Sequence, residues 1–375
     1  MKFDINKNEL LKVLNFAQPF IGSNNTLPII ENVKFDYNKD LEMAFIEGTC
    51  LDASIRMNIT IDNLEGEFKP FSVNHYDITK LISLIDYDIV NIETVKNTMT
   101  ITTPFLDTFD LPTTPVSEFP EINFEVGDEH GLSMTSKMFS SIISEFKDFC
   151  GRDELRPVLS SIYFESEGTD LVITATNAHM LYHKVYKNHL ADDSKIEFLL
   201  PNHPALKKFY GDELFINYNE STIIVNGGSY LMSFVMTVGK YPNYKAVIPD
   251  EENAEYTLEI DTAPFANNLK IATVLSPKAS KTIAIEKKED KLTLRAEDLD
   301  FNKKGVINIK GTSSNDMQTG FNNEFFKILI SHVSDDTFKM YGSKNRANVI
   351  VETVAEDTIE KLLLLMPVML TDGSA

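Results

Sequence analysis

The chain has 375 residues, a formal net charge of −21 and an apolar share of 43%. This length suggests two or three domains with a sizeable core; no apolar run reaches the ~18–20 residues of a membrane helix, and two cysteines are too few for a disulfide framework. The acidic balance excludes a protein that binds phosphates with its whole surface, although positive charge confined to one face is compatible with it.

Amphipathic helices are predicted twice in each third of the chain. Residues 6–21 place Leu10 and Leu14 on one stripe and Lys12 opposite them, as in a helix with one buried face. The same spacing predicts helices over residues 6–21, 74–86, 135–150, 202–210, 263–275 and 322–334. The second helix of each third has an asparagine as its expected N-cap, at Asn74, Asn202 and Asn322.

Runs with strand alternation lie between these helices, and the thirds end alike, on Phe119-Pro120, Tyr241-Pro242 and Met366-Pro367. We therefore predict an α+β protein of three similar domains, each with two helices and a β-rich layer, over residues 1–124, 125–252 and 253–375. The alternative is an α+β protein whose thirds look alike by chance. Six helices in the repeated order helix–strands–helix–strands disfavour it.

Positive charge is concentrated on the predicted helices. Their segments carry nine lysines and six acidic residues, although the whole chain is strongly acidic. If these helices line one surface that faces a polyanion, the low charge density favours weak, sequence-independent contact. The alternative is that lysine, a good helix former, occupies any solvated helix face. The candidate lysines of this surface are Lys12, Lys80, Lys137, Lys207, Lys208, Lys270 and Lys327.

Seven segments, taken in their order and spacing, resemble the bacterial DNA polymerase III beta subunit, or sliding clamp, and its phage-encoded relatives. No single segment is specific, but the resemblance extends over essentially the whole chain, from Met1 to Leu370. The segments are MKFDINKNELLKVL at the N-terminus, NTLPIIENVKF (25–35), RPVLSSIYFESEG (156–168), TNAHML (176–181), GKYPNYKAVIP (239–249), GFN (320–322) and MPVML (366–370).

The resemblance implies the DNA clamp fold and a homodimer joined head to tail into a ring around duplex DNA. In such a ring the helices line the hole, the sheets form the rim, and the helix lysines face DNA. The implied partners are duplex DNA without sequence preference, a replicative DNA polymerase, a clamp loader ATPase and a second copy of the chain, with no membrane. Such a ring is a processivity factor, because encirclement retains the protein on DNA without strong phosphate contacts.

The resemblance also implies a pocket between the second and third domains, in which partner proteins insert a short peptide with apolar anchors. An apolar cleft with polar groups at its edge suits such anchors, and methionines adapt to several ligands. The alternatives are an ordinary terminal strand at the C-terminus and a structural, hydrogen-bonded His179. Carried over by motif, the pocket residues are Arg156, Leu159, Thr176, His179, Met180, Leu181, Pro242, Val247, Asn322, Leu364, Met366, Pro367, Val368, Met369 and Leu370.

The chain departs from the family pattern at several of these positions. Thr-Asn-Ala-His-Met-Leu stands where the family often has Thr-Asp-Gly-His-Arg-Leu, and Met180 and Met369 replace frequent arginines. We therefore expect a less positive and more apolar pocket. Asn24 and Asn25 stand in a loop where many relatives carry arginine, which argues against the DNA contact there, and residues 371–375 extend past the usual terminus.

The ring interface is implied between the first domain of one chain and the third domain of the other. Leu106, near the strand at 105–111, and Val274 with Leu275 match apolar interface positions. Packing inside the core of a single chain is an equal alternative for these three residues, because apolar side chains serve both purposes.

An enzyme is the main competing class. The sequence has no P-loop, HExxH, CxxC or GxSxG motif, and its seven histidines show no metal-ligand spacing. We therefore expect no enzymatic activity, no catalytic residues, no cofactor and no metal site. The N-terminal MKFDINKNELL lacks a signal-peptide core, which together with the free cysteines predicts a cytoplasmic protein. The third class is a multidomain protein-binding scaffold that does not encircle DNA.

Overall fold

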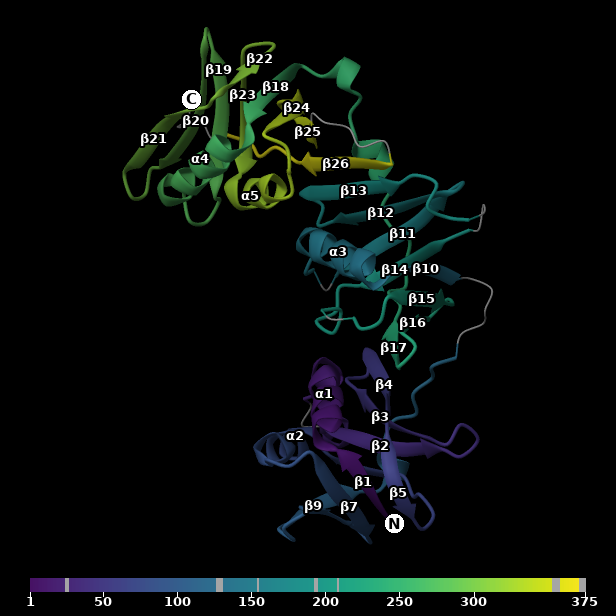
Figure 1. The fold of residues 1–375 in the computed structure, drawn as a ribbon. Helices are drawn as coiled ribbons and strands as arrows, with labels where there is room; N and C mark the ends of the chain where they lie inside the picture. The colour runs from purple at the N-terminus through teal and green to yellow at the C-terminus, as the bar shows by residue number, and fades with distance from the viewer. Residues whose placement is uncertain are drawn as a thin grey trace. The chain divides into compact units, whose positions relative to one another are not determined.

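The computed structural model describes residues 1–23, 27–125, 131–153, 155–191, 195–207, 209–352 and 358–370. The chain divides into two compact units: unit 1 is Met1–Ile143 with His203–Met236, and unit 2 is Ser144–Asn202 with Thr237–Ala375 (Figure 1). The three expected domains, with boundaries at residues 124 and 252, stay a prediction. The expectations for Asn24, Asn25, Lys208 and residues 371–375 lie outside the described residues.

Unit 1 contains one antiparallel sheet of thirteen strands. In order of pairing they are β10 (Gly131–Thr135), β15 (Glu213–Tyr218), β16 (Thr222–Asn226), β17 (Tyr230–Val235), β4 (Ala53–Ile59), β3 (Met43–Thr49), β2 (Asn32–Asn38), β6 (Phe71–Asn74), β9 (Thr108–Thr114), β8 (Thr98–Thr102), β7 (Ile89–Val95), β1 (Lys2–Asn6) and β5 (Ile61–Glu65). The pairing of β4 with β17, in which Ala53 lies opposite Phe234, joins the first third to the middle third.

Helices α1 (Lys7–Ala17) and α2 (His75–Leu84) of unit 1 pack against each other and against this sheet (Figure 1). They begin after Asn6 and Asn74, and both asparagine side chains accept backbone N–H groups of the first helical turn, which confirms the predicted N-cap Asn74. The apolar stripe of α1 is buried, as its spacing predicts. Three short 3₁₀ turns complete the unit: η1 (Gln18–Phe20), η2 (Pro28–Glu31) and η3 (Val116–Glu118).

Unit 2 contains two antiparallel sheets. The first has β14 (Glu197–Pro201), β11 (Ser161–Glu167), β12 (Asp170–Thr176), β13 (Met180–Tyr186), β26 (Ile359–Leu365), β25 (Arg346–Glu352), β24 (Thr337–Ser343), β18 (Tyr256–Asp261) and β22 (Gly311–Ser313). The second has β21 (Lys303–Asn308), β20 (Lys291–Asp298), β19 (Thr282–Lys288) and β23 (Met317–Asn322). The pairing of β13 with β26 joins the middle third to the last third over the full length of both strands.

Helix α3 (Ser136–Phe146) spans the division between the units, whereas α4 (Thr262–Leu275) and α5 (Asn323–Ser331) belong to unit 2 and pack against each other. The Asn322 side chain accepts two backbone N–H groups of α5, which confirms this predicted N-cap. No helix in the described ranges is long and apolar enough to span a membrane. The remaining 3₁₀ turns are η4 (Lys147–Phe149), η5 (Pro157–Ser160), η6 (Tyr244–Val247) and η7 (Glu251–Asn253).

The predicted helix over residues 202–210 is wrong for the described residues of that segment, which form a turn. The stretch between Pro204 and Gly211 is short, and His203 competes for the backbone: its Nδ1 accepts the N–H of Ala205 at 3.1 Å. Asn202 does not cap a helix, because its side chain donates to the Lys147 carbonyl oxygen at 3.0 Å. Apolar spacing alone therefore overstated the helix content of the middle third.

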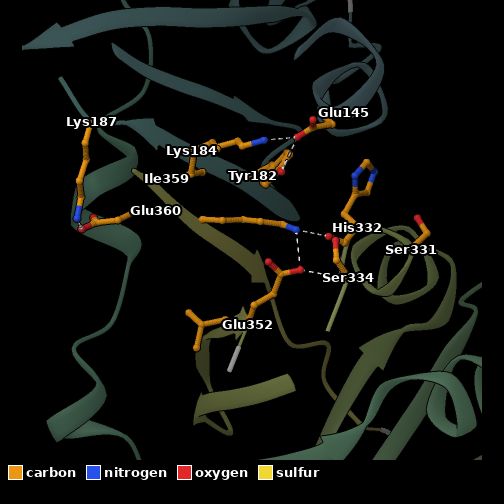
Figure 2. A pocket seen from close by; sticks show the side chains of 12 residues that line it. Glu145, Tyr182, Lys184, Lys187, Ser331, His332, Ser334, Glu352, Ile359 and Glu360 are labelled. Atoms are coloured by element: carbon orange, nitrogen blue, oxygen red, sulfur yellow. Dashed lines mark hydrogen bonds and ion pairs between the residues drawn. The ribbon is translucent and has the colours of Figure 1, made fainter. Parts of the chain in front are cut away.

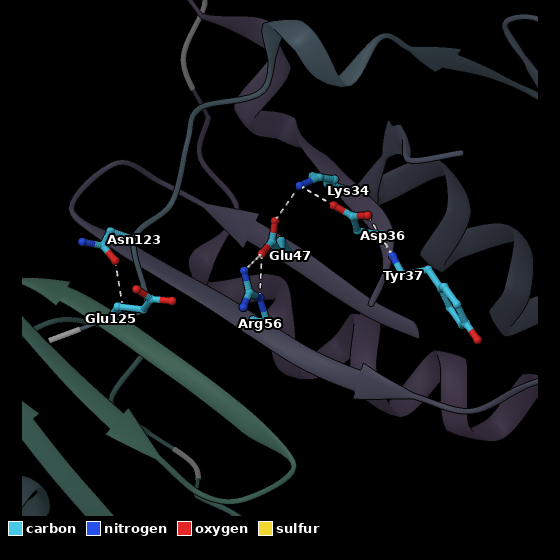
Figure 3. A network of polar contacts seen from close by, with 7 residues as sticks. All are labelled: Lys34, Asp36, Tyr37, Glu47, Arg56, Asn123 and Glu125. Carbon is cyan, nitrogen blue, oxygen red and sulfur yellow. Dashed lines mark hydrogen bonds and ion pairs between the residues drawn. The ribbon is translucent and has the colours of Figure 1, made fainter. Parts of the chain in front are cut away.

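A buried carboxylate links three strands of unit 1, and its arginine partner packs on the connector, residues 119–125, which follows η3. Glu47 on β3 is 3% exposed and accepts hydrogen bonds from Arg56 of β4 at 2.7 and 2.8 Å and from Lys34 of β2 at 3.1 Å (Figure 3). The Arg56 guanidinium lies 4.6 Å from the ring centroids of both Phe45 and Phe124. Phe124 belongs to the connector, so this cluster fixes the connector on the sheet.

Replacing Arg56 with Met should lower the free energy of unfolding of unit 1 by about 3 kcal/mol, because Glu47 would keep a single cationic partner in a buried site. The measurement is urea unfolding followed by circular dichroism. Lys39→Met is the matched control, since its ion pair with Glu67 is exposed to water and should contribute far less to stability. Equal shifts for the two variants would refute the assignment.

Candidate functional site

A tight hairpin joins β12 to β13 and carries four of the predicted pocket residues. The Thr176 hydroxyl donates to the Met180 carbonyl oxygen at 2.7 Å and accepts the N–H of Ala178 at 3.1 Å. Ala178 has a φ of +72°, in the left-handed region that glycine adopts more easily. The turn exposes His179, whose ring stacks on the Phe325 ring of α5 with 5.5 Å between centroids. The hairpin thus presents an imidazole beside α5.

The C-terminal tail, residues 366–370, lies next to this hairpin. The N–H of Met366 donates to the His179 carbonyl oxygen at 2.8 Å, and the N–H of Val368 donates to the Gly320 carbonyl oxygen of β23 at 2.9 Å. A Cβ at Gly320 would lie 2.6 Å from the Val368 oxygen and 2.7 Å from Leu370, so only glycine lets the tail approach β23. The expected alternative, an ordinary terminal strand, is wrong, because β26 ends before Met366 and Val368 makes only an isolated bridge.

The turn η5 supplies another part of the predicted pocket. Leu159 is buried there, and its carbonyl oxygen accepts the N–H of Gly151 at 2.6 Å. Arg156 precedes the turn and is exposed, with an ion pair to Asp153 at 2.8 Å. The segment that leads to Pro242 passes close to η5, since a Cβ at Gly239 would lie 2.8 Å from Val158.

Two hollows of unit 2 are lined in part by the tail. One, of about 840 Å³, is lined by Val247 and Met366 among others. The other, of about 300 Å³, is lined by Met369 and Leu370 together with residues of β19 and β20. Because Val247 is 49% exposed and Met369 is 95% exposed, an apolar group from outside the chain can reach both hollows.

The predicted pocket residues fall into two groups by exposure. Leu159, Thr176, Met180, Leu181 and Leu364 are buried and form walls, whereas Asn322 caps α5. Met180 is expected from the sequence to make the pocket surface more apolar. It is instead buried and pairs with Leu365 of β26, so it contributes to the wall of the pocket and not to its surface. The exposed or half-buried remainder is Arg156, His179, Pro242, Val247, Met366, Pro367, Val368, Met369 and Leu370.

A polar hollow of about 550 Å³ lies where β13 and β26 pair. The Tyr182 hydroxyl and Lys184 donate to Glu145 at 2.8 and 2.9 Å, and Lys361 donates to Glu352 at 2.9 Å (Figure 2). Burial and the Glu145 carboxylate raise the pKa of Tyr182 well above its usual range, so Tyr182 remains a donor. No local sequence pattern predicts this network, because its members come from α3, β13, β25 and β26.

No metal site emerges from the described ranges, in which no three His, Cys, Asp or Glu side chains are grouped closely enough to hold an ion. His183 and His332 are half-buried: burial lowers the pKa of His183 to about 4 and also lowers the pKa of His332. Both rings are therefore neutral at pH 7.

Among the described residues, no lysine of α1 to α5 forms an ion pair with a carboxylate. The ion pairs of the described residues use lysines on strands, loops and 3₁₀ turns, such as Lys34 and Lys361, and none on α1 to α5. An unpaired lysine keeps its full charge for an external anion. Lys207 lies in the turn rather than in a helix. The exposed candidates are Lys12, Lys80, Lys137, Lys207 and Lys270, and Lys327 is half-buried.

The three predicted interface residues are not core residues of a single chain. Leu106 in unit 1 is 80% exposed and Val274 in unit 2 is 68% exposed, so core packing is wrong for both. Leu275 is half-buried against Gly305 of β21, where a Cβ would lie 2.3 Å from its Cδ1. Exposed apolar neighbours enlarge each surface, Phe105 beside Leu106 and Ile271 beside Val274. Such apolar surfaces are typical of protein–protein contacts.

Known proteins resemble this chain over nearly its whole length. Residues 1–123 match the family model of the DNA polymerase III beta subunit, N-terminal domain. The beta sliding clamp of Vibrio cholerae is 21% identical, over 99% of this chain and 100% of that protein, and that of Staphylococcus epidermidis is 21% identical, over 97% and 98%. Crystal structures of the Thermotoga maritima beta subunit (TM-score 0.85, 17% identity) and the Bacillus subtilis sliding clamp (TM-score 0.87, 18% identity) each cover 99% of this chain and 100% of the other. The chain therefore has the fold of these clamp structures, and its residues 1–123 match the N-terminal domain of the DNA polymerase III beta subunit.

Proposed function

We propose that this protein is a DNA sliding clamp: two chains join head to tail, enclose duplex DNA and tether a replicative DNA polymerase as a processivity factor. The observation that carries the proposal is the whole-length likeness to beta sliding clamps in sequence and in fold. A clamp loader ATPase would open and close the ring on DNA. The protein would act in the cytoplasm, without catalytic chemistry or a cofactor, through domains 1–124, 125–252 and 253–375.

The proposed DNA contacts are the candidate lysines of α1 to α5, together with Lys207 and Lys208. The described members of this set have no carboxylate partner among the described residues, whereas a net charge of −21 makes the chain as a whole repel phosphate. A few free lysines give weak contacts that any sequence satisfies, so the protein can move along DNA. Retention then comes from enclosure, and tethering makes rebinding of the polymerase effectively intramolecular. The proposed contacts are Lys12, Lys80, Lys137, Lys207, Lys208, Lys270 and Lys327.

The proposed dimer interface pairs the surface around Leu106 with the surface around Val274 and Leu275 of the second copy. Both surfaces expose apolar side chains, and burying them on association is favourable by roughly 25 cal/mol per Å². Because the two surfaces differ, the contact is heterologous. Two chains then form a closed ring only if each copy supplies both surfaces.

The proposed docking site for partner peptides is the hairpin, η5 and tail region of unit 2. Its exposed imidazole and guanidinium groups, of His179 and Arg156, would sit at the edge of a peptide whose apolar anchors enter the hollows beside Val247 and Met369. The tail residues Met366 and Leu370 would supply adaptable apolar contact. The walls would be held in place by the buried members Leu159, Thr176, Met180, Leu181 and Leu364.

Loaded protein should stay on closed circular duplex DNA and run off linear DNA with free ends. Because retention depends on enclosure, we expect at least a tenfold larger bound fraction on circles after gel filtration. Val274→Asp is the control: it places a charge in the interface, so it should give a monomeric mass at micromolar concentration and no retention on either DNA. Equal retention of the unmodified protein on circles and linear DNA would contradict enclosure and favour a scaffold.

Deleting residues 366–370 should weaken binding of a polymerase-derived peptide with Leu and Phe anchors by at least 100-fold, because the tail lines both hollows. Isothermal titration calorimetry measures the affinity. The dimer mass should be unchanged, since Leu106, Val274 and Leu275 remain in place. An unaltered affinity would reject the docking site while leaving the clamp assignment intact.

A further inference from the structure

Unit 1 repeats the main-chain geometry of the proposed docking site. The turn η2 corresponds to η5: Leu27 precedes it with φ −138° and ψ 73°, as Arg156 precedes η5 with φ −132° and ψ 65°. Ile30 accepts the N–H of Gly22 at 3.1 Å, as Leu159 accepts that of Gly151. Both turns begin with proline, and so their starting φ is fixed in the same way.

The hairpin between β3 and β4 corresponds to the hairpin between β12 and β13. The Thr49 hydroxyl accepts the N–H of Leu51 at 3.0 Å and donates to the Ala53 carbonyl oxygen at 3.4 Å, the same two hydrogen bonds that Thr176 makes. Leu51 has a φ of +77°, close to the +72° of Ala178. The two turns therefore have one backbone design.

The hydrogen bond between the end of the neighbouring strand and the hairpin is repeated as well. The N–H of Val235, at the end of β17, donates to the Asp52 carbonyl oxygen at 2.9 Å, as the N–H of Met366 donates to the His179 carbonyl oxygen. We call the set of Leu27, Ile30, Thr49, Leu51, Asp52 and Val235 the second docking frame. All of its members belong to unit 1.

The second docking frame exposes apolar side chains beside acidic ones. Leu51 is 48% exposed and Val235 is 54% exposed, although both lie at ordered hydrogen-bonded positions. Asp52 occupies the position that His179 has in unit 2, and Glu31 occupies the position of Ser160 in η5. Leu27 stands at the position of Arg156, so unit 1 has no cation there. The positive edge of the site in unit 2 is therefore replaced by a negative one.

We propose that the second docking frame binds a short peptide that has apolar anchors and is flanked by lysine or arginine. This inference rests on the proposed function, because the docking role of the frame in unit 2 is its template. Apolar anchors suit Leu51 and Val235, and the cationic flank complements Asp52 and Glu31. One chain then binds two classes of partner peptide, which the charge at the edge of each frame separates.

The test uses the tail-deleted protein, which lacks residues 366–370 and so isolates the second docking frame. Two fluorescein-labelled peptides share one Leu-Phe core and differ in their flanks, lysines in one and glutamates in the other, and fluorescence anisotropy reports binding. We expect the lysine-flanked peptide to bind at least tenfold more tightly than the glutamate-flanked peptide. Asp52→Lys should remove or reverse this preference.

Leu51→Asn is the second variant, because asparagine tolerates a positive φ and removes only the apolar anchor. It should weaken the lysine-flanked peptide at least tenfold, whereas Leu41→Asn, at another exposed leucine of unit 1, should not. The inference would be overturned by no binding to the tail-deleted protein, or by equal binding to the tail-deleted protein with and without Leu51→Asn. The circular-DNA experiment tests the clamp function separately: if that function fails, the protein is not retained on circular DNA, whatever the peptides do.

Discussion

Main-chain pairing between strands of different thirds is the constraint on which the rest of the structure depends. β4 pairs with β17 in unit 1, and β13 pairs with β26 in unit 2. Bringing such distant segments together costs loop-closure entropy before any contact forms, so the ladder has to be continuous to be stable. The register of β13, in which every residue from Met180 to Tyr186 faces one of Ile359–Leu365, meets this requirement. The candidate site lies at the end of this ladder, where the hairpin and the tail leave the sheet.

Because β13 begins and β26 ends at the same point, the adjoining hairpin and tail emerge side by side. The hydrogen bond from Met366 to His179 continues the ladder by one step, after which the tail turns toward Gly320. The tail residues beyond the ladder are not part of a strand, so their side chains do not alternate between a buried and an exposed face. Exposed apolar groups such as Met369 can therefore stand next to buried walls without any cost to the sheet.

Sequence periodicity predicted five helices and two of three N-caps, because a buried stripe and an asparagine cap are local signals. It failed at residues 202–210, where His203 and Pro204 decide the backbone and the apolar spacing does not. The motif resemblance named the pocket residues but gave Met180 a surface role that burial denies it. The β13–β26 ladder and the network around Glu145 could not be predicted, since alternation in a strand does not identify its partner.

The paired docking frames show which parts of a repeated unit are free to diverge. Thr49 and Thr176 make the same two hydrogen bonds, and the residues two positions later share a left-handed backbone, so these positions are constrained by the turn itself. The carbonyl oxygens of Asp52 and His179 accept a hydrogen bond from the neighbouring strand, which the main chain of any residue can do. Their side chains face solvent and can change charge without disturbing the fold. Divergence in recognition is therefore expected at the side chains of the hairpin tip, where the backbone demands least.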